Sequence, residues 1–567
     1  MSWSPDGAWL ACVTSAATAS RHEVWLVRPD GGDLHLAAGA GASTAVIGRG
    51  PWHGWSADSR LLVTEADGVS TEGFSTALLV TPLTGARRTL AAGPLLTLLD
   101  ISRDNRYALL RRGPRGVRSL VVVDVEAGAE TPIALGFGSG STDTGCLSPN
   151  GAVVYASTDV GRELAALVAV RVDGTAPPAV LAQRQDAELQ DVVFAADGRR
   201  AILAWNLLGG HSALSLLNLC SGTESAVGPL PRDVIDECRF YPDGSRLALT
   251  AESWYDPRGV WSIDPATSAA TPLSSTGSHT LASSHGASRS SVEVDELARP
   301  ELRRLRSADG LELTGWLYRP AGPGPWPTMI HLHGGPEAQE RPVYNSLFQT
   351  LVAAGIAVFA PNVRGSSGFG RSFRNADDLA GRYGAVTDVA ACAEYLVKTG
   401  TAEPHRLGCM GRSYGGYLTL LSLVEYPELF AVGVDISGMS NFDSFFAHTE
   451  SWIAAAAVSK YGHPRHDAPL LRDLSPIHRI DRLTAPLLIV HGAGDTNVPV
   501  EEAEQVVAAL AVRGAEHRYL LFHDEGHELL ATVNRVAFVQ ATVAWVREHL
   551  QALEPCDAVP MGVPDQQ

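Results

Sequence analysis

A turn motif recurs through the first half of the chain. Four-residue segments with Asp or Asn at the third position begin at residues 4, 56, 102, 148, 195 and 241, so they are spaced 46 to 52 residues apart. Short apolar segments such as 201–204 and 246–249 follow most of them, and Asp-Gly or Asn-Gly turns between short strands are typical of hairpins. A repeat of about 40–50 residues with four strands per unit predicts a β-propeller.

The number of blades is six to seven. Six turns are visible, and a degenerate seventh unit is expected between about residues 274 and 296, although this segment is rich in Ser, His and Gly and is equally well interpreted as a loop. The first turn begins at Ser4, which leaves no room for a preceding strand. The first blade is therefore expected to be incomplete, to be closed by a C-terminal strand of the propeller, or to have lost its start.

The second half contains Gly411-Arg412-Ser413-Tyr414-Gly415, which fits the pattern G-x-S-x-G. In α/β-hydrolases this pattern forms a sharp turn from strand to helix that exposes a serine oxygen. An apolar strand is predicted over 406–410 and a helix over about 414–425, so the turn has the context that the pattern requires. Ser413 is therefore a candidate nucleophile.

A serine hydroxyl needs a base, and a carboxylate must orient that base. Asp495 follows a buried strand predicted over 485–492, and His527 follows a strand predicted over 518–522. Both lie where open α/β sheets place their sites, at the carboxyl ends of strands, and the order Ser, Asp, His is that of α/β-hydrolases. The sequence predicts Asp495 as orienting acid and His527 as base.

Nearby residues compete for these two roles. His523 is a second candidate base, and Asp524 and Glu525 are alternative orienting acids, although side chains so close to His527 along a tight turn rarely face it. His491 lies inside the predicted buried strand and is interpreted as a core histidine.

Acyl transfer also needs donors for the developing oxyanion. One donor is normally the backbone N–H after the nucleophile, here Tyr414. A second is expected from the loop after the strand predicted over 328–332, which continues as His333-Gly334-Gly335-Pro336. Gly335 is the preferred donor and Gly334 the alternative, since glycine lets the backbone approach a substrate oxygen.

Five segments in order resemble the prolyl oligopeptidase family of serine peptidases, and most closely its acylaminoacyl-peptidase-like branch. They are His333–Pro336, Asn362–Gly370, Gly411–Gly416, His491–Pro499 and Asp524–His527. The resemblance covers about residues 297–552 and implies a triad of Ser413, Asp495 and His527. It also implies a propeller that acts as a gate and admits short or flexible substrates. The predicted architecture is an N-terminal all-β propeller gate domain over 1–297, a C-terminal α/β-hydrolase domain over 298–552, and a disordered tail over 553–567.

The substrate pocket is predicted less directly. Phe445, Phe446 and Trp452 follow a predicted strand and either line an apolar acyl pocket or pack a helix on the sheet. Many relatives carry arginine where this chain has Asn497, which is predicted to contact the substrate backbone more weakly. Glu528 follows the proposed base, where a carboxylate could raise the pKa of the histidine or bind a substrate amine. These departures leave aminopeptidase and small-amide hydrolysis open.

Composition excludes several other functions. The net charge is 44 − 62 = −18, and no basic run suggests binding to nucleic acid. No apolar run reaches about 18 residues, and no secretory signal is visible, so no membrane association is expected. Seven cysteines without a C-x-x-C pair predict a cytoplasmic protein. No cluster has metal-ligand spacing, so neither a metal nor another cofactor is expected.

The sequence therefore predicts a serine peptidase that hydrolyses short peptides, of acylaminoacyl-, amino- or oligopeptidase type, through an acyl-enzyme. Its partner would be a short peptide or a small acyl-amide, and formation of a homo-oligomer is left open. One alternative is an esterase or amidase for small metabolites on the same triad. The other is a non-catalytic binding protein built on the propeller.

Overall fold

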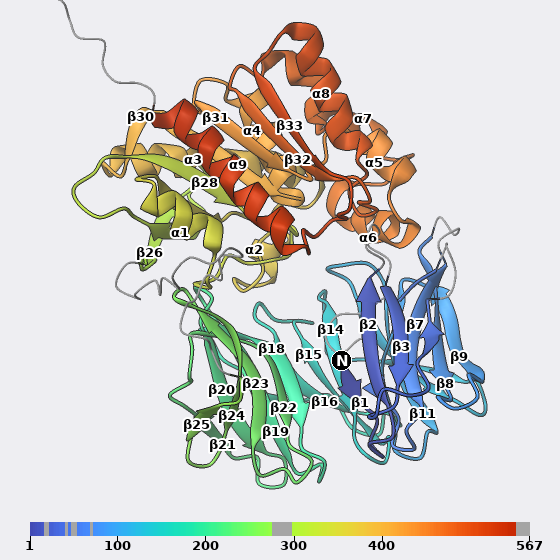
Figure 1. Cartoon of the computed structure of the whole chain (residues 1–567). Coiled ribbons are helices and arrows are strands. Elements are labelled where there is room, and N and C mark those ends of the chain that lie inside the picture. The colour runs from blue at the N-terminus through green and yellow to red at the C-terminus, as the bar shows by residue number, and fades with distance from the viewer. Residues whose placement is uncertain (16–21, 40–43, 47–53, 68–71, 275–296, 552–567) are drawn as a thin grey trace, which may run out of the picture.

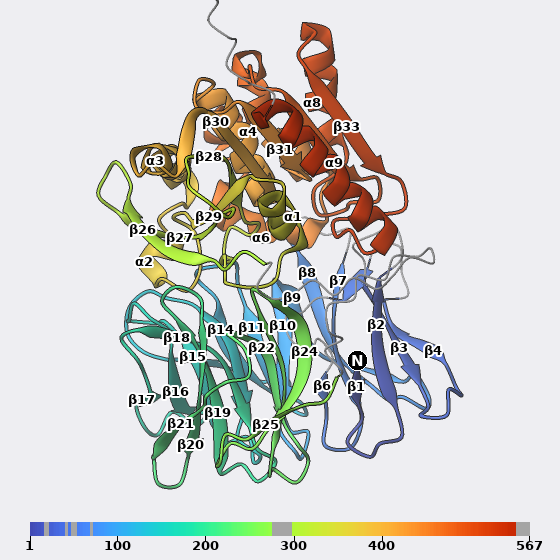
Figure 2. The same cartoon turned by 60° about the vertical axis from the view of Figure 1, so that its left-hand side comes forward.

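The structure is a computed structural model that describes residues 1–15, 22–39, 44–46, 54–67, 72–274 and 297–551. An all-β domain and an α/β domain are stacked on each other, as two views show (Figure 1, Figure 2). This confirms the predicted fold class, a β-propeller followed by an α/β-hydrolase domain. The proposed seventh unit and the proposed tail fall outside the described residues, and the exact boundary at 297–298 stays a prediction.

The described part of the propeller has six blades, each a mainly four-stranded antiparallel sheet. The first three blades contain β1 (Ser2–Trp3), β2 (Leu10–Ser15), β3 (His22–Val27) and β4 (His35–Ala38); β5 (Thr44–Val46), β6 (Gly54–Trp55), β7 (Leu61–Asp67), β8 (Phe74–Val80) and β9 (Arg87–Pro94); and β10 (Leu96–Ile101), β11 (Tyr107–Arg112), β12 (Ser119–Asp124) and β13 (Glu130–Ile133). The other three contain β14 (Thr142–Leu147), β15 (Val153–Thr158), β16 (Ala166–Arg171) and β17 (Ala179–Ala182); β18 (Ala187–Phe194), β19 (Arg200–Leu207), β20 (Ser212–Asn218) and β21 (Glu224–Val227); and β22 (Val234–Phe240), β23 (Leu247–Ser253), β24 (Asp256–Ile263) and β25 (Ala270–Pro272).

The recurring turn joins the first two strands of five blades, and in the second blade it joins β6 to β7. In the first blade the Ser4 hydroxyl donates to Asp6 (2.6 Å) and accepts from the N–H of Trp9 (2.9 Å). The same pair of bonds recurs around Ser56, Ser102 and Ser148. The residue after each Asp or Asn has a positive φ, which explains why glycine is frequent there. The motif found in the sequence is therefore a self-contained hydrogen-bonded turn.

The α/β domain is built on an eight-stranded sheet with the order β26-β27-β29-β28-β30-β31-β32-β33. The strands on the β26 side pair antiparallel, and those from β29 to β33 pair parallel. Their bounds are β26 (Glu301–Arg306), β27 (Glu312–Tyr318), β28 (Trp326–Leu332), β29 (Ala357–Asn362), β30 (Ala402–Arg412), β31 (Val432–Ile436), β32 (Leu487–Gly492) and β33 (His517–Phe522).

Helices cover both faces of this sheet. They are α1 (Ser346–Ala353), α2 (Arg371–Arg374), α3 (Arg382–Lys398), α4 (Tyr414–Glu425), α5 (Phe442–His448), α6 (Ser451–Tyr461), α7 (Ala468–Asp473), α8 (Glu501–Arg513) and α9 (Thr532–Gln551), with 3₁₀ turns η2 (Leu379–Gly381) and η3 (Pro476–Arg482). Among the described residues, no helix is both long and apolar enough to cross a membrane.

The central strands are apolar on both sides because each side contributes to a core. Along β32, Leu487 and Ile489 pack in the core that includes α3, α4 and α8, whereas Leu488 and Val490 pack in the core that includes α1 and α9. Side chains alternate between the faces of a strand, so a continuous apolar run is what a parallel strand covered on both faces requires. The prediction of a buried parallel strand here is confirmed.

Glycines of the segment Asn362–Gly370 let the two domains approach closely. The carboxylate of Glu188, in β18 of the propeller, accepts hydrogen bonds from the N–H groups of Gly368 (3.1 Å) and Gly370 (2.9 Å). A Cβ at Gly370, where φ is +94°, would lie 2.5 Å from Glu163 of the propeller. This glycine-rich segment therefore joins the domains.

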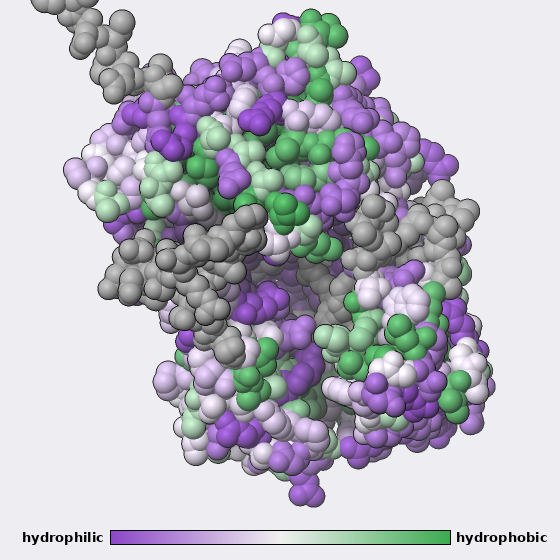
Figure 3. Space-filling model, viewed as in Figure 1, coloured by the Kyte–Doolittle hydropathy of each residue, from purple (hydrophilic) through white to green (hydrophobic). Residues whose placement is uncertain are grey.

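Further contacts between the domains lie around this segment and on the opposite rim. Arg374 pairs with Asp159 (2.6 Å), and Arg341 donates to the carbonyl of Gly210 (2.6 Å). On the other rim the Ser451 hydroxyl, at the start of α6, donates to the carbonyl of Asp67 in β7 (2.9 Å). Between these contacts the surface is hollowed at the junction of the two domains (Figure 3).

Candidate active site

Ser413 occupies a strained turn between β30 and α4. Its φ of 58° and ψ of −118° are rare for a residue with a side chain, and its N–H donates to the carbonyl of Ile436 (2.8 Å). A Cβ on Gly415 would lie 1.9 Å from the carbonyl oxygen of Leu332, so only glycine allows the first turn of α4 to pack on the end of β28. The turn has the strand-to-helix context predicted for a nucleophile elbow.

Asp495 and His527 meet at the carboxyl ends of β32 and β33. The Nδ1 atom of His527 lies 2.7 Å from Oδ2 of Asp495, and Asp495 is 6% exposed. The other oxygen, Oδ1, accepts from the N–H groups of Asn497 and Val498, both at 2.9 Å. Burial raises the pKa of the Asp495 carboxyl, but attraction to His527 and these hydrogen bonds outweigh it, so the pKa lies below its ordinary value. The carboxylate is thus ionised and fixed in place.

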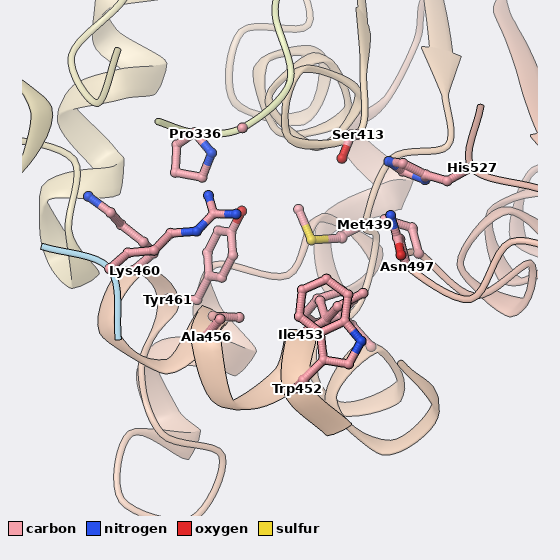
Figure 4. A pocket seen from close by; sticks show the side chains of 15 residues that line it. Pro336, Ser413, Met439, Trp452, Ile453, Ala456, Lys460, Tyr461, Asn497 and His527 are labelled. Atoms are coloured by element: carbon pink, nitrogen blue, oxygen red, sulfur yellow. The ribbon is translucent and has the colours of Figure 1, made fainter. Parts of the chain in front are cut away.

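Ser413 and His527 line the same corner of one cavity. Figure 4 shows the serine oxygen and the imidazole ring beside each other at this corner. Each of the three side chains predicted to form a triad comes from a different strand end, and the parallel sheet brings those ends together.

The competing residues lie elsewhere. His523 is exposed, Asp524 accepts from the Asn534 amide (3.0 Å), and the buried carboxylate of Glu525 accepts from the N–H groups of Leu530 and Ala531. Among the described residues, none of these three side chains forms a hydrogen bond or an ion pair with His527.

His491 is buried, as expected for a core histidine. Its Nε2 lies 2.9 Å from the carbonyl of Val498 and 3.5 Å from Oδ2 of Asp495. Its Nδ1 has no hydrogen-bond partner among the described residues. Burial lowers the pKa of His491, so the ring is neutral beside the acid.

The predicted oxyanion donors belong to the start of α4, directly after Ser413, and to the loop after β28. Tyr414 is the first residue of α4, so its N–H has no acceptor within the helix. Gly335 lines the cavity with φ at +134°, and a Cβ on the adjacent Gly334 would lie 3.6 Å from Cβ of Ser413. The glycine loop after β28 therefore passes directly against the candidate nucleophile.

The cavity beside Ser413 has a volume of about 230 Å³ and a mainly apolar wall. Of the pocket residues predicted from sequence, Phe445, Trp452 and Asn497 line it, whereas Phe446 packs on Phe442 and Phe445 (ring centroids 6.4 and 5.3 Å apart). Of the three predicted aromatic residues, two thus line the pocket and Phe446 does not. The remaining lining residues were not anticipated: Arg115, Pro336, Met439, Ile453, Ala456, Ala457, Lys460, Tyr461 and Val498.

Two cations line the cavity away from Ser413. Lys460 is almost fully buried, and its ammonium group contacts Glu337 (3.0 Å), Asp378 (2.7 Å) and the carbonyl of Arg374 (3.2 Å). Its three donors are therefore used within the protein. The other cation, Arg115, comes from the loop between β11 and β12 of the propeller. Burial raises the pKa of the Glu337 carboxyl, but the positive charges of Lys460 and then Arg115 outweigh it, so this pKa lies below its ordinary value.

Glu528 contacts an arginine in place of the base. One oxygen of its carboxylate lies 2.7 Å from Nη1 of Arg412, the residue before Ser413. The other arm of the same guanidinium donates to the backbone carbonyl of His527. No signal in the sequence connects these positions, because Arg412 ends β30 and Glu528 lies on the loop after β33, 116 residues later.

The residues that the structure describes include no group of three or more His, Cys, Asp or Glu side chains arranged to hold a metal ion. The site therefore offers a hydroxyl, an imidazole, a carboxylate and backbone donors around an apolar cavity. These are the groups that acyl transfer through a serine requires.

The sequence matches the Prolyl oligopeptidase family over residues 342–553. Among curated proteins, the Dipeptidyl aminopeptidase BIII of Pseudoxanthomonas mexicana is 36% identical over 233 residues, which are 40% of this chain and 34% of that protein. An uncharacterized peptidase of Bacillus subtilis is 32% identical over 274 residues, 47% of this chain and 41% of that protein. The matches thus span about two fifths or less of the length of these curated relatives.

Solved structures share the fold over almost the whole chain. A puromycin-hydrolyzing peptidase of Mycobacterium tuberculosis superposes with a TM-score of 0.80 at 19% identity, covering 96% of this chain and 93% of that one. The acylaminoacyl peptidase of Pyrococcus horikoshii superposes with a TM-score of 0.68 at 17% identity, covering 98% and 88% of the two chains. The likeness therefore extends through both domains.

Proposed function

We propose that this chain is a serine peptidase that hydrolyses short peptides, because residues 342–553 match the Prolyl oligopeptidase family. The observation that carries the proposal is the hydrogen bond of 2.7 Å between His527 and Asp495 in the same cavity corner as Ser413. A hydroxyl, an imidazole and a buried carboxylate are the groups that a Ser-His-Asp triad uses, and the bond between His527 and Asp495 supports this assignment.

In the proposed mechanism, Oγ of Ser413 attacks the substrate carbonyl while Nε2 of His527 takes the hydroxyl proton. Asp495 holds Nδ1 of the ring, which fixes the tautomer and stabilises the imidazolium that forms. The N–H groups of Tyr414 and Gly335 donate to the oxyanion of the tetrahedral intermediate.

Collapse of this intermediate breaks the C–N bond, and His527 gives its proton to the leaving amine. The acyl group then remains as an ester on Ser413. Water, deprotonated by His527, attacks this ester, and the proton returns to the serine as the acid product leaves. The chain's own residues supply every group in these steps.

The cavity suits a substrate with one apolar side chain next to the scissile bond. Its volume of about 230 Å³ lies below the range of pockets that hold drug-sized ligands, and Met439, Phe445 and Ile453 form part of its wall. We propose that Asn497 and Arg115 contact the backbone of a bound peptide from opposite domains. The propeller then acts as a gate that limits substrates to short peptides, as the stacking of the domains supports (Figure 2).

The type of peptidase is the finer part of the proposal. The curated relatives include proteins named as a dipeptidyl aminopeptidase and as acylamino-acid-releasing enzymes. Peptide substrates with a free N-terminus and with a blocked N-terminus should therefore both be assayed. The cytoplasmic location predicted from the dispersed cysteines also remains a proposal.

A fluorophosphonate probe tests the nucleophile. We expect it to label the wild-type chain at Ser413 and to leave Ser413→Ala unlabelled. The control is Ser444→Ala, which removes a hydroxyl that contacts Glu502 and should still be labelled. Rates on peptide p-nitroanilides and on p-nitrophenyl esters then compare peptidase with esterase activity. Labelling without any amide hydrolysis would contradict the peptidase, and absence of labelling would contradict the serine hydrolase.

A further inference from the structure

Arg412 bridges the two loops that carry the proposed nucleophile and base. It lies directly before Ser413 at the end of β30, and its guanidinium reaches the loop between β33 and α9. Its Nη1 donates to the carboxylate of Glu528 at 2.7 Å, and its Nη2 donates to the backbone carbonyl of His527. One planar group thus binds the residue that carries the imidazole and the residue that follows it.

The loop between β33 and α9, which carries His527, is also held by hydrogen bonds to Glu525. None of these bonds involves the backbone of His527. Glu525 accepts from the N–H groups of Leu530 (2.8 Å) and Ala531 (2.9 Å) and from the amide of Asn534 (2.8 Å). Its carbonyl accepts from the N–H of Gly494 (2.9 Å). These bonds shape the loop before and after the imidazole, whereas Arg412 holds the backbone of the imidazole residue itself.

The backbone of Arg412 is held firmly in the sheet. Its backbone belongs to β30, where it is opposite Ile436 in β31, and the next residue donates its N–H to the Ile436 carbonyl at 2.8 Å. A guanidinium presents its donors in a fixed plane, so two bonds from it restrain both the position and the rotation of the loop it holds. The separation of Ser413 from His527 is therefore set partly through this side chain.

We propose that Arg412 is a positioning residue that keeps His527 within reach of Ser413, with Glu528 as its counter-ion. The inference rests on the proposed serine mechanism. It assigns Glu528 a role in holding Arg412, in place of contact with a substrate amine.

Stability and catalysis should respond differently to loss of this pair. The Arg412 and Glu528 side chains are 32% and 65% exposed, and ion pairs at such sites contribute little to folding. A displacement of about 1 Å at a reacting group, by contrast, can cost about a hundredfold in rate. A purely structural role predicts parallel losses, whereas a positioning role predicts a loss of turnover in a protein of nearly unchanged stability.

The test uses the full chain with Arg412→Gln, Arg412→Lys, Glu528→Gln and the double variant of Arg412→Gln with Glu528→Gln. Arg304→Gln is the matched control, because Arg304 forms a similarly exposed pair with Glu312 (2.9 Å) on β26 and β27. The readouts are kcat and KM on a peptide p-nitroanilide, the rate constant of fluorophosphonate labelling, and the urea midpoint.

We expect Arg412→Gln to lower kcat and the labelling rate together by about ten- to a hundredfold, with KM and the urea midpoint nearly unchanged. Arg412→Lys should recover part of the rate, because an ammonium keeps the charge but holds only one partner well. Glu528→Gln should cost less than Arg412→Gln, since the bond to the His527 carbonyl remains. The double variant should be no slower than Arg412→Gln, because both changes break one unit.

The pH profile supplies a second readout. The titratable or charged groups around His527 are Asp495, His491, Arg412 and Glu528, with Arg115 and Lys460 on the cavity wall. Arg412→Gln leaves the carboxylate of Glu528 without its counter-ion on the loop that carries His527, which should move the acid limb of kcat/KM to higher pH. Glu528→Gln leaves the cation and should move this limb to lower pH.

Two results would overturn the inference: a labelling rate for Arg412→Gln equal to wild type, or a change confined to KM, which would make Arg412 a substrate contact. Failure of the proposed function looks different, because the wild-type chain itself would then not be labelled at Ser413.

Discussion

Arg115 and Ser413 line the same cavity although they belong to different domains. The arginine comes from a loop of the propeller, and the serine from the turn between β30 and α4 of the catalytic domain. The candidate pocket is therefore complete only when the two domains are docked, which is how a propeller could contribute to specificity as well as to access.

Arg115→Ala should weaken binding of peptides while sparing small esters. We expect KM for a tripeptide p-nitroanilide to rise roughly tenfold, the loss of about one charge-assisted hydrogen bond. KM for p-nitrophenyl acetate should stay the same, because an acetyl group is too short to reach the side of the cavity that the propeller forms. Arg118→Ala, in the same propeller segment but paired with Asp143, is the control and should match wild type in both assays. Equal KM changes for both substrates would contradict the contact.

Asp495→Asn should lower kcat by about 10⁴-fold without unfolding the protein. The asparagine oxygen can still accept from the N–H groups of Asn497 and Val498, but the amide cannot hold His527 in the required tautomer. Steady-state rates on a p-nitroanilide measure the effect. Asp524→Asn is the control, because Asp524 contacts Asn534, and it should retain the wild-type rate. A larger loss in the control would reassign the orienting acid.

Gly335→Ala should reduce kcat by roughly a hundred- to a thousandfold, the usual cost of losing one oxyanion donor. The φ of +134° is strained for alanine, and the added Cβ would lie 2.8 Å from the N atom of Glu337 and 2.9 Å from that of Ala338. The loop that carries the donor must therefore change its conformation.

Gly322→Ala separates backbone strain from loss of the donor. Gly322 also has a positive φ, +92°, but its Cβ would meet open space. This variant should lose stability in urea and keep its kcat. If Gly335→Ala behaved in the same way, Gly335 would not be an oxyanion donor.

Asp435 should make the protein less stable as the pH rises. This carboxyl is fully buried under the start of α4, and burial raises its pKa from 3.8 to about 7. Between these values the folded state keeps a proton that the unfolded chain has lost, so unfolding releases a proton and the free energy of unfolding falls with pH. The loss should begin near pH 4 and level off above about pH 7.

Asp435→Asn should remove this dependence. We expect the free energy of unfolding, from urea titrations at pH 5 and pH 8, to fall by on the order of a few kcal/mol more in wild type than in the variant. The slope of the free energy of unfolding against pH is compared between wild type and Asp435→Asn, so any effect of the new amide that does not depend on pH cancels. Asp243→Asn, at an exposed turn where hydrogen bonds to Ser245 lower the pKa, should keep the wild-type slope. Identical slopes for Asp435→Asn and wild type would show that Asp435 is ionised in the folded state.

Much of the architecture follows from short-range patterns. The turns around Ser4, Ser56, Ser102 and Ser148 close their own hydrogen bonds, so the blades were predictable from a few residues each. The helix after Ser413 begins and ends at the residues predicted, because α4 starts at the turn that the glycines require. The count of blades beyond six was not decided by pattern, since the segment 274–296 contains no clear turn motif.

By itself, the sequence determined which side chains stand at the ends of parallel strands, and thus that Ser413, Asp495 and His527 would share one edge of a sheet. This follows because alternation along a strand and the direction of parallel strands are local properties that any correct sheet must satisfy. Only the tertiary structure decided that Phe445 lines the cavity and Phe446 does not, that Arg115 reaches the cavity from the propeller, and that Arg412 binds Glu528. These contacts depend on how loops and domains dock, and docking is set by the shapes of surfaces that no periodicity in the chain encodes.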